Sequence, residues 1–284
     1  MGVSGQIILC EVCKSLRFTQ LVVADVTTLN FNLLFEIGYA LSLGRPVLPI
    51  RDTSYVKDQK LFDELGLLDT FGYLDFRNSR ALCRGIYDRL GASPLSLPAV
   101  PVNTEQPLYL VKSHVYNEGM VKLMSTLKKS GLRFRSFDPR ETSRLSLHEA
   151  LKQVSSSLGV VVHLVSPERE GALTHNSRCA FLAGIAMGAG KHILMLQETR
   201  VQQPIDYREV VRCYSSATKV PDLLIPLITQ VVGKLQESRF VPTALPLTVL
   251  EKVDLGDLAA ENEIRALRSY FVATGQYNEA LVSG

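Results

Sequence analysis

Residues 20–50, QLVVADVTTLNFNLLFEIGYALSLGRPVLPI, carry the pattern of a strand, a loop, a helix and a second strand. The opening QLVVAD is a short apolar run rich in β-branched residues, which predicts a buried parallel strand that ends at Asp25. NLLFEIGYALSL lacks the alternation of a strand and is long enough for three helical turns, and Gly44 follows as a common helix terminator. PVLPI predicts the next strand. The stretch is therefore a βαβ unit, for which a right-handed crossover is the rule.

Strand and helix patterns keep alternating along the rest of the chain. Four prolines between residues 90 and 107 predict a linker. Before it we expect helices over 58–68 and 79–90 and a strand over 71–76; after it we expect strands over 108–112, 133–137, 159–165 and 192–197, helices over 118–130, 147–156, 178–189 and 221–237, and a helix or strand over 207–214. This alternation predicts an α/β fold with Rossmann-like (flavodoxin-like) parallel sheets in tandem.

An internal repeat relates the two halves of the chain at a spacing of 146 residues. The identical pairs are Asn30 and Asn176, Phe35 and Phe181, Gly38 and Gly184, Ala40 and Ala186, and Gly44 and Gly190. We therefore expect two copies of one fold, over 1–93 and 108–240, joined by a linker over 94–107. The first copy is abbreviated, because about one strand–helix–strand is missing from its front unless the chain is a piece of a longer protein. Residues 241–284 are expected to form a proline-bearing connector and a helical tail.

Two acids mark the first copy. Asp25 ends its first strand and Glu36 lies in the first turns of the next helix, where the second copy has Leu164 and Leu182 in our alignment. Ligands of open α/β sheets bind at the carboxyl ends of the strands, so both acids can face one pocket. A carboxylate beside an anomeric carbon stabilises an oxocarbenium-like state or attacks it, and a second acid or an asparagine manages sugar hydroxyls or the proton of the base.

Residues 24–50 also resemble a known group of enzymes. The stretch is similar to nucleoside 2-deoxyribosyltransferases, to related nucleotide N-glycosidases and to TIR-type NAD-cleaving domains, through Asp25, Asn30, Asn32, Phe35, Glu36, Ile37, Gly38, Tyr39 and Ala40. The resemblance implies that Glu36 is the nucleophile or charge stabiliser and that Asp25 contacts the sugar or base. It also implies substrate contacts for Asn30, Asn32, Phe35, Gly38 and Tyr39. In that family the first strand and its loop supply further contacts, so here the second copy or a second subunit completes the pocket, or there is no catalysis.

Two functions follow as alternatives. The first is a hydrolase or transferase of the N-glycosyl bond in a nucleoside or nucleotide, with NAD among the candidates. The second is a non-catalytic nucleotide-sensing or assembly module of a larger, ATPase-containing and defence-related protein. Plainer interpretations stand beside both, because Glu36 can be a surface helix residue, Asp25 a loop cap, and Phe35 and Tyr39 core residues. His114, which follows the strand over 108–112, is a further candidate for a small-molecule contact.

Composition excludes several other classes. The net charge of +3 argues against dedicated nucleic-acid binding, and the lack of an 18-residue apolar run argues against a membrane span. The first residues do not have the pattern of a secretory signal, so we expect a cytoplasmic protein. Five cysteines in 284 residues do not make a disulfide scaffold, and no spacing predicts a metal site or calls for a cofactor. We expect a homo-oligomer or a part of a larger multidomain protein.

Overall fold

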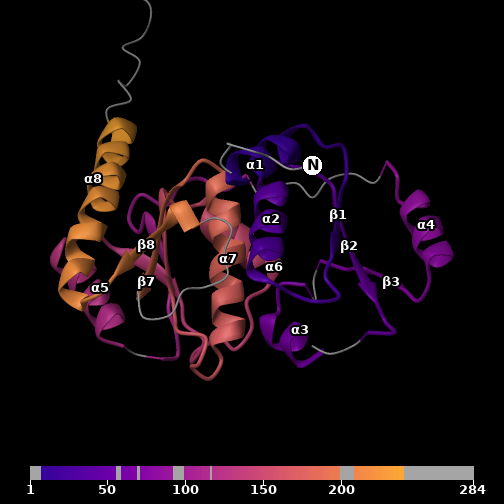
Figure 1. The fold of residues 1–284 in the computed structure, drawn as a ribbon. Helices are drawn as coiled ribbons and strands as arrows, with labels where there is room; N and C mark the ends of the chain where they lie inside the picture. The colour runs from indigo at the N-terminus through magenta and orange to yellow at the C-terminus, as the bar shows by residue number, and fades with distance from the viewer. Residues whose placement is uncertain are drawn as a thin grey trace, which may run out of the picture. The chain divides into compact units, whose positions relative to one another are not determined.

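Two parallel sheets interleaved with helices make up the described part of the chain (Figure 1). The structure is a computed structural model, and it describes residues 8–55, 59–68, 71–91, 99–115, 117–198 and 208–239. Apart from the last two residues of α8, the elements below belong to one compact unit that ends at Glu237. The helical tail expected over 241–284 lies outside the described residues. The expected fold class, tandem Rossmann-like α/β domains, is confirmed.

The first copy contains a three-stranded parallel sheet in the order β1-β2-β3. Its elements are α1 (Ile8–Phe18), β1 (Val22–Asp25), α2 (Phe31–Ser42), β2 (Val47–Asp52), α3 (Gln59–Leu65), β3 (Leu74–Phe76) and α4 (Ser79–Tyr87). The Asn30 side chain accepts a hydrogen bond from the Leu33 N–H at 2.8 Å and so caps α2. Gly44 follows the helix with φ = +66°, a conformation that glycine adopts without strain.

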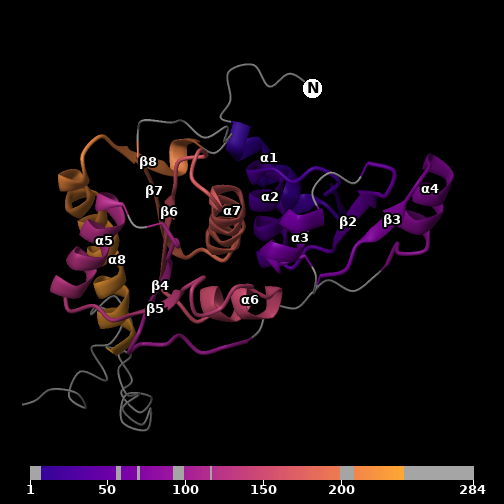
Figure 2. The same ribbon diagram turned by 90° about the horizontal axis from the view of Figure 1, so that it is seen from below.

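The second copy contains a five-stranded parallel sheet in the order β5-β4-β6-β7-β8. Its elements are β4 (Leu108–Val111), α5 (Glu118–Lys129), β5 (Phe134–Phe137), α6 (Leu147–Ser155), β6 (Gly159–Leu164), α7 (Ala172–Gly188), β7 (His192–Glu198), the 3₁₀ turn η1 (Arg208–Val210), β8 (Val211–Tyr214), the 3₁₀ turn η2 (Ala217–Lys219) and α8 (Val220–Arg239). This is the flavodoxin-like order, in which the chain reverses direction across the sheet between β4 and β6. Figure 2 shows α5 and α8 on one face of this sheet and α6 and α7 on the other.

The first sheet corresponds to β6-β7-β8 of the second. Within the described residues, the first copy has no counterpart of β4, α5 and β5, which is the segment that the sequence predicts to be missing. The strand register also corrects our alignment by one position. Asp25 pairs with Ile50, whose counterpart Leu196 pairs with His163, so His163 and not Leu164 is the equivalent of Asp25.

Helices α2 and α7 join the two copies through matching glycines. A Cβ atom on Gly38 would come within 3.0 Å of the Phe181 carbonyl oxygen, and one on Gly184 would come equally close to the Phe35 carbonyl oxygen. Because residues 35 and 38 are the repeat equivalents of 181 and 184, the two contacts are related by the internal repeat. The apolar core beneath this helix pair is shared, and it includes Leu34 and Ile37 of α2 together with α7 residues. Close helix approach of this kind requires small residues at the crossing point.

One helix start was predicted at the wrong residue, and one element was predicted without deciding between helix and strand. Helix α7 begins at Ala172, six residues before the expected start at 178, and 207–214 contains a short 3₁₀ turn followed by strand β8. In the predicted linker, residues 99–107 contain no helix or strand, and 92–98 lie outside the described residues. Among the described helices, none is both long enough and apolar enough to cross a membrane.

Candidate functional site

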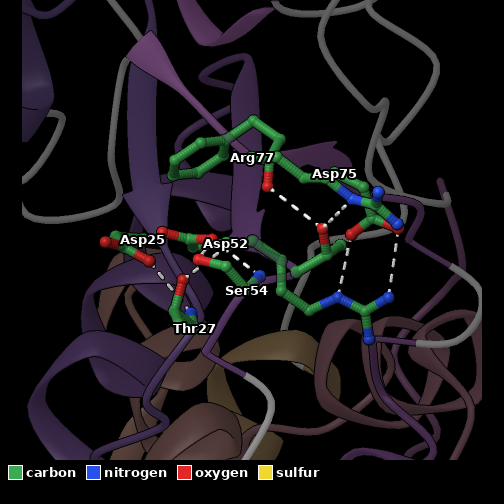
Figure 3. A network of polar contacts seen from close by, with 9 residues as sticks. Asp25, Thr27, Asp52, Ser54, Asp75 and Arg77 are labelled. Carbon is green, nitrogen blue, oxygen red and sulfur yellow. Dashed lines mark hydrogen bonds and ion pairs between the residues drawn. The ribbon is translucent and has the colours of Figure 1, made fainter.

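A chain of hydrogen bonds runs along the carboxyl ends of the first sheet (Figure 3). The exposed Asp25 carboxylate accepts a bond from the Thr27 N–H at 2.9 Å, and the Thr27 hydroxyl accepts one from the Asp52 N–H at 2.8 Å. Asp52 in turn accepts bonds from the Ser54 N–H at 2.8 Å and from its hydroxyl at 2.6 Å. The Ser54 hydrogen bonds lower the pKa of Asp52. Two carboxylates therefore stand at neighbouring strand ends, each tied into its own loop.

Next to Asp52, the charged side chains of this edge contact each other and hold neighbouring strands together. Arg51 forms a bidentate ion pair with Asp75, with N···O distances of 2.9 and 3.1 Å, and its guanidinium lies 4.1 Å from the centre of the Tyr73 ring. Arg77 donates a weak hydrogen bond to the Thr53 hydroxyl at 3.3 Å. These contacts hold β2 against β3. The other two acids of this edge, Asp25 and Asp52, accept hydrogen bonds from their own loops, and Asp25 is exposed to solvent.

The predicted substrate-binding residues of α2 differ in their exposure. Asn30 is exposed and caps the helix, and Asn32 is half-buried in the first turn. Phe35 and Tyr39 are each 2% exposed, and Gly38 lies against the backbone of α7. The Tyr39 hydroxyl accepts a hydrogen bond from Arg17 at 3.1 Å. These three buried residues therefore have packing partners inside the helix pair, and their role in substrate binding stays a prediction.

The two predicted catalytic acids lie on different elements, Asp25 at the end of β1 and Glu36 on α2. Ala24 and Val26 are buried in the core beneath α2, so Asp25 between them faces the opposite side of the sheet. Glu36 lies on α2, on the first side, and is half-buried. The joint catalytic role of the Asp25 and Glu36 carboxyl groups stays a prediction.

A preformed cleft lies instead in the second copy. A cavity of about 860 Å³ has the first two turns of α5 as one wall, and the end of β8 and the turn after it as the other. A second cavity of about 360 Å³ shares Asn117, Arg169 and Glu198 with it. We call the combined space the α5 cleft; its lining is Val115, Asn117, Glu118, Gly119, Val121, Lys122, Ser125, Val165, Ser166, Glu168, Arg169, Glu198, Tyr214, Ser215, Ser216, Ala217 and Thr218. These residues follow β4, β6, β7 and β8, so the cleft crosses the reversal point of the sheet.

Tyr214 forms the floor of the α5 cleft. It is 4% exposed, its ring stacks on His163, and its hydroxyl lies 2.6 Å from the Nε2 atom of that histidine. A Cβ atom on Gly119 would overlap the hydroxyl, so only glycine leaves room for it. Burial raises the pKa of Tyr214 to about 12, and burial together with the charge of His175 lowers the pKa of His163 to about 3. The floor is therefore an uncharged hydrogen-bonded pair at neutral pH.

The rim of the cleft carries charges of both signs. Arg169 and Lys122 are exposed, and their side chains form no hydrogen bond or ion pair with any residue that the structure describes. Glu118 and Glu168 are exposed on the same rim. Ser216 and Thr218 bond to each other at 2.9 Å. The lining therefore offers two cations, three carboxylates (Glu118, Glu168 and Glu198) and several hydroxyls.

His114 faces a third cavity, of about 360 Å³, between α3 and the second copy. Its Nε2 atom lies 2.7 Å from the Glu170 carbonyl oxygen. The guanidinium of the nearby buried Arg178 donates to the backbone carbonyls of Glu64, Leu65 and Ser143. The hydrogen bonds of Arg178 beside this cavity connect α7 to α3. The expected ligand contact of His114 stays a prediction.

Sequence reasoning missed the α5 cleft, because its lining comes from α5 and from loops that are distant in the chain. Two lining residues belong to local capping motifs: Asn117 caps α5 by accepting from the Met120 N–H at 2.8 Å, and Ser216 caps η2 by accepting from the Thr218 N–H. Within the described ranges, no group of three or more His, Cys, Asp or Glu side chains is placed to hold a metal ion. Comparison of the chain with protein-family models, curated proteins and solved structures gives no match.

Proposed function

We propose that this chain binds a nucleotide in the α5 cleft and works as a ligand-sensing module. The observation that carries the proposal is a preformed cavity of about 860 Å³ across the carboxyl ends of a complete flavodoxin-ordered sheet. Small-molecule sites typically have volumes of about 300–1,000 Å³ and occur at this position in open α/β sheets. The lining of hydroxyls, an amide and charges of both signs offers partners to a sugar and to a phosphate alike.

A tryptophan placed at the rim tests the proposal, because the chain has none of its own. Val121 is 57% exposed and lines the cleft, so the variant Val121→Trp carries a single reporter there. Lys128→Trp places the same reporter two turns along α5 on an exposed position outside the lining. We expect a saturable fluorescence change on titration with nucleotides in the first variant only. Calorimetric titration of the unmodified chain checks the result. If no nucleotide gives a measurable heat of binding, the proposal is wrong.

A second candidate function is cleavage or transfer of an N-glycosyl bond at the first copy. It is favoured by the exposed Asp25 carboxylate, which lies beside Asp52 at the sheet edge where a sugar would bind. Within the described residues no strand pairs with the other edge of β1, so a second subunit or a further domain would have to complete the pocket.

Base release separates the two candidates. Wild type, Glu36→Gln and Asp25→Asn are incubated with nucleosides, deoxynucleotides and NAD, with Glu141→Gln as an exposed control outside both sites. Release that both test variants abolish and the control retains would establish the enzyme. Retained nucleotide binding without release in wild type would leave the sensing module as the function.

A further inference from the structure

The α5 cleft consists of a larger and a smaller cavity. The smaller cavity contacts the apolar side chains of Val115 and Val165, the latter buried, and the rest of its lining is polar or charged: Asn117, Ser166, Glu168, Arg169 and Glu198. The larger cavity opens between Lys122 on α5 and Arg169 in the loop after β6. Arg169 lines both cavities, so a ligand that occupied both of them would contact this side chain.

The two cations have no partner among the described residues. Glu118, Glu168 and Glu198 also line the cleft, so a bound anion has to contact the two cations directly. A guanidinium suits a phosphate for such a contact because it donates in a planar fork. The N-terminal end of α5 lies on the same wall, where the Asn117 side chain already accepts from the Met120 N–H, and its helix dipole adds to the attraction for an anion. The combined volume exceeds what a phosphate alone would fill, which leaves the smaller cavity, with its two valines and its polar side chains, for a base and its sugar.

We infer that the α5 cleft recognises a nucleoside 5′-monophosphate by its phosphate, held by Arg169 and Lys122, with the sugar and base directed toward Val115, Val165 and Glu198. This inference rests on the proposed nucleotide binding and adds to it a preference for the phosphorylated form. The carboxylate of Glu198 accepts hydrogen bonds from ribose hydroxyls in this arrangement, and the Tyr214 floor closes the cleft beneath the ligand.

Calorimetric titration of the full chain tests the phosphate preference. The probes are AMP, GMP, CMP and UMP, the four matching nucleosides, and inorganic phosphate. At least one monophosphate is expected to bind about tenfold or more tightly than its nucleoside, and its affinity is expected to fall with added salt. Inorganic phosphate alone is expected to bind more weakly than that monophosphate, because it leaves the smaller cavity empty.

Arg169→Ala is compared with Arg133→Ala, which removes an exposed arginine just before β5, at the opposite edge of the sheet. The first variant should lose most of the preference for the monophosphate and keep its nucleoside affinity, whereas the second should match wild type. Equal binding of nucleoside and monophosphate by wild type, or equal affinities in the two variants, would overturn the inference and leave nucleotide binding intact. Binding of neither compound would overturn the proposed function as well.

Discussion

The glycine contact between α2 and α7 predicts a large effect of one added methyl group. In Gly184→Ala the new Cβ atom would lie 2.9 Å from the Phe35 carbonyl carbon, 3.0 Å from the Tyr39 nitrogen and closer still to the Phe35 carbonyl oxygen. Non-bonded heavy atoms pack at about 3.5–4.0 Å, and the Phe35 carbonyl oxygen is the closest obstruction, so the helices must separate by roughly 1 Å or more. Because the obstructing atoms are backbone, no change of rotamer relieves the overlap.

The expected cost follows from two opposing effects. Overpacking typically destabilises a core by about 1–3 kcal/mol, and a backbone obstruction belongs near the upper end of that range. Alanine is favoured over glycine inside a helix by about 1 kcal/mol, which offsets part of the cost. We therefore expect Gly184→Ala to lower the free energy of unfolding by about 2 kcal/mol. For a unit of this size that corresponds to a fall in Tm of about 4–8 °C.

Thermal unfolding followed by circular dichroism measures the effect, with Gly233→Ala as the matched control. Gly233 lies inside α8, and a Cβ atom there meets nothing within 4 Å, so this variant should gain up to about 1 kcal/mol. The repeat-related Gly38→Ala should resemble Gly184→Ala. The double variant should cost less than the sum, because one separation of the helices relieves both overlaps. A Gly184→Ala chain as stable as the Gly233→Ala chain would refute this account of the helix pair.

Three further predictions concern the caps and the buried polar groups. Burial, with smaller contributions from neighbouring groups, lowers the pKa of His163 to about 3 and of His175 to about 4, so between pH 7 and pH 5 the unfolded chain takes up protons that the folded chain does not. Urea unfolding should therefore give a free energy of unfolding about 4 kcal/mol lower at pH 5 than at pH 7, and His175→Gln should show a weaker dependence on pH. Gly119→Ala should displace the Tyr214 hydroxyl and cost about 1–3 kcal/mol, visible as altered near-ultraviolet circular dichroism. Asn30→Ala should remove the α2 cap and lower the unfolding free energy by about 1 kcal/mol, an effect that is absent if the cap is redundant.

The strands and most helices could be predicted because their cause is local. Parallel strands buried on both faces are continuous apolar runs, as in Gly159–Leu164, and the glycines after α2 and α7 end the helices in a conformation that glycine favours. The start of α7 could not be predicted, because Thr174, His175 and Asn176 have the composition of a loop. They are buried since their bonds reach other segments: the Asn176 amide bonds to both the N–H and the carbonyl of Val165.

The site was harder to predict than the fold for the same reason. Asp25 and Glu36 are close in sequence and begin from one sheet edge, which suggests a shared pocket. Whether they share one depends on which face of the sheet α2 covers, and that is set by its packing on α7 in the other copy. The α5 cleft depends on four strand ends brought together by the order of the sheet. No single segment of the sequence carries that information.

The difference between Asp25 and its counterpart His163 follows from the missing strand–helix–strand. In the second copy the face to which His163 points is covered by α5 and α8, and a carboxylate there would have to be desolvated, so a neutral histidine bonded to Tyr214 occupies the position. In the first copy no described helix takes the place of α5. The neighbouring Val23 is 42% exposed, and the Asp25 carboxylate is exposed to solvent. The segment from β4 to β5 contains α5, which covers this face, and it also contains β4, the strand beside which the α5 cleft opens. One structural difference thus gives the second copy a formed cleft with an uncharged floor and the first copy an open acidic edge.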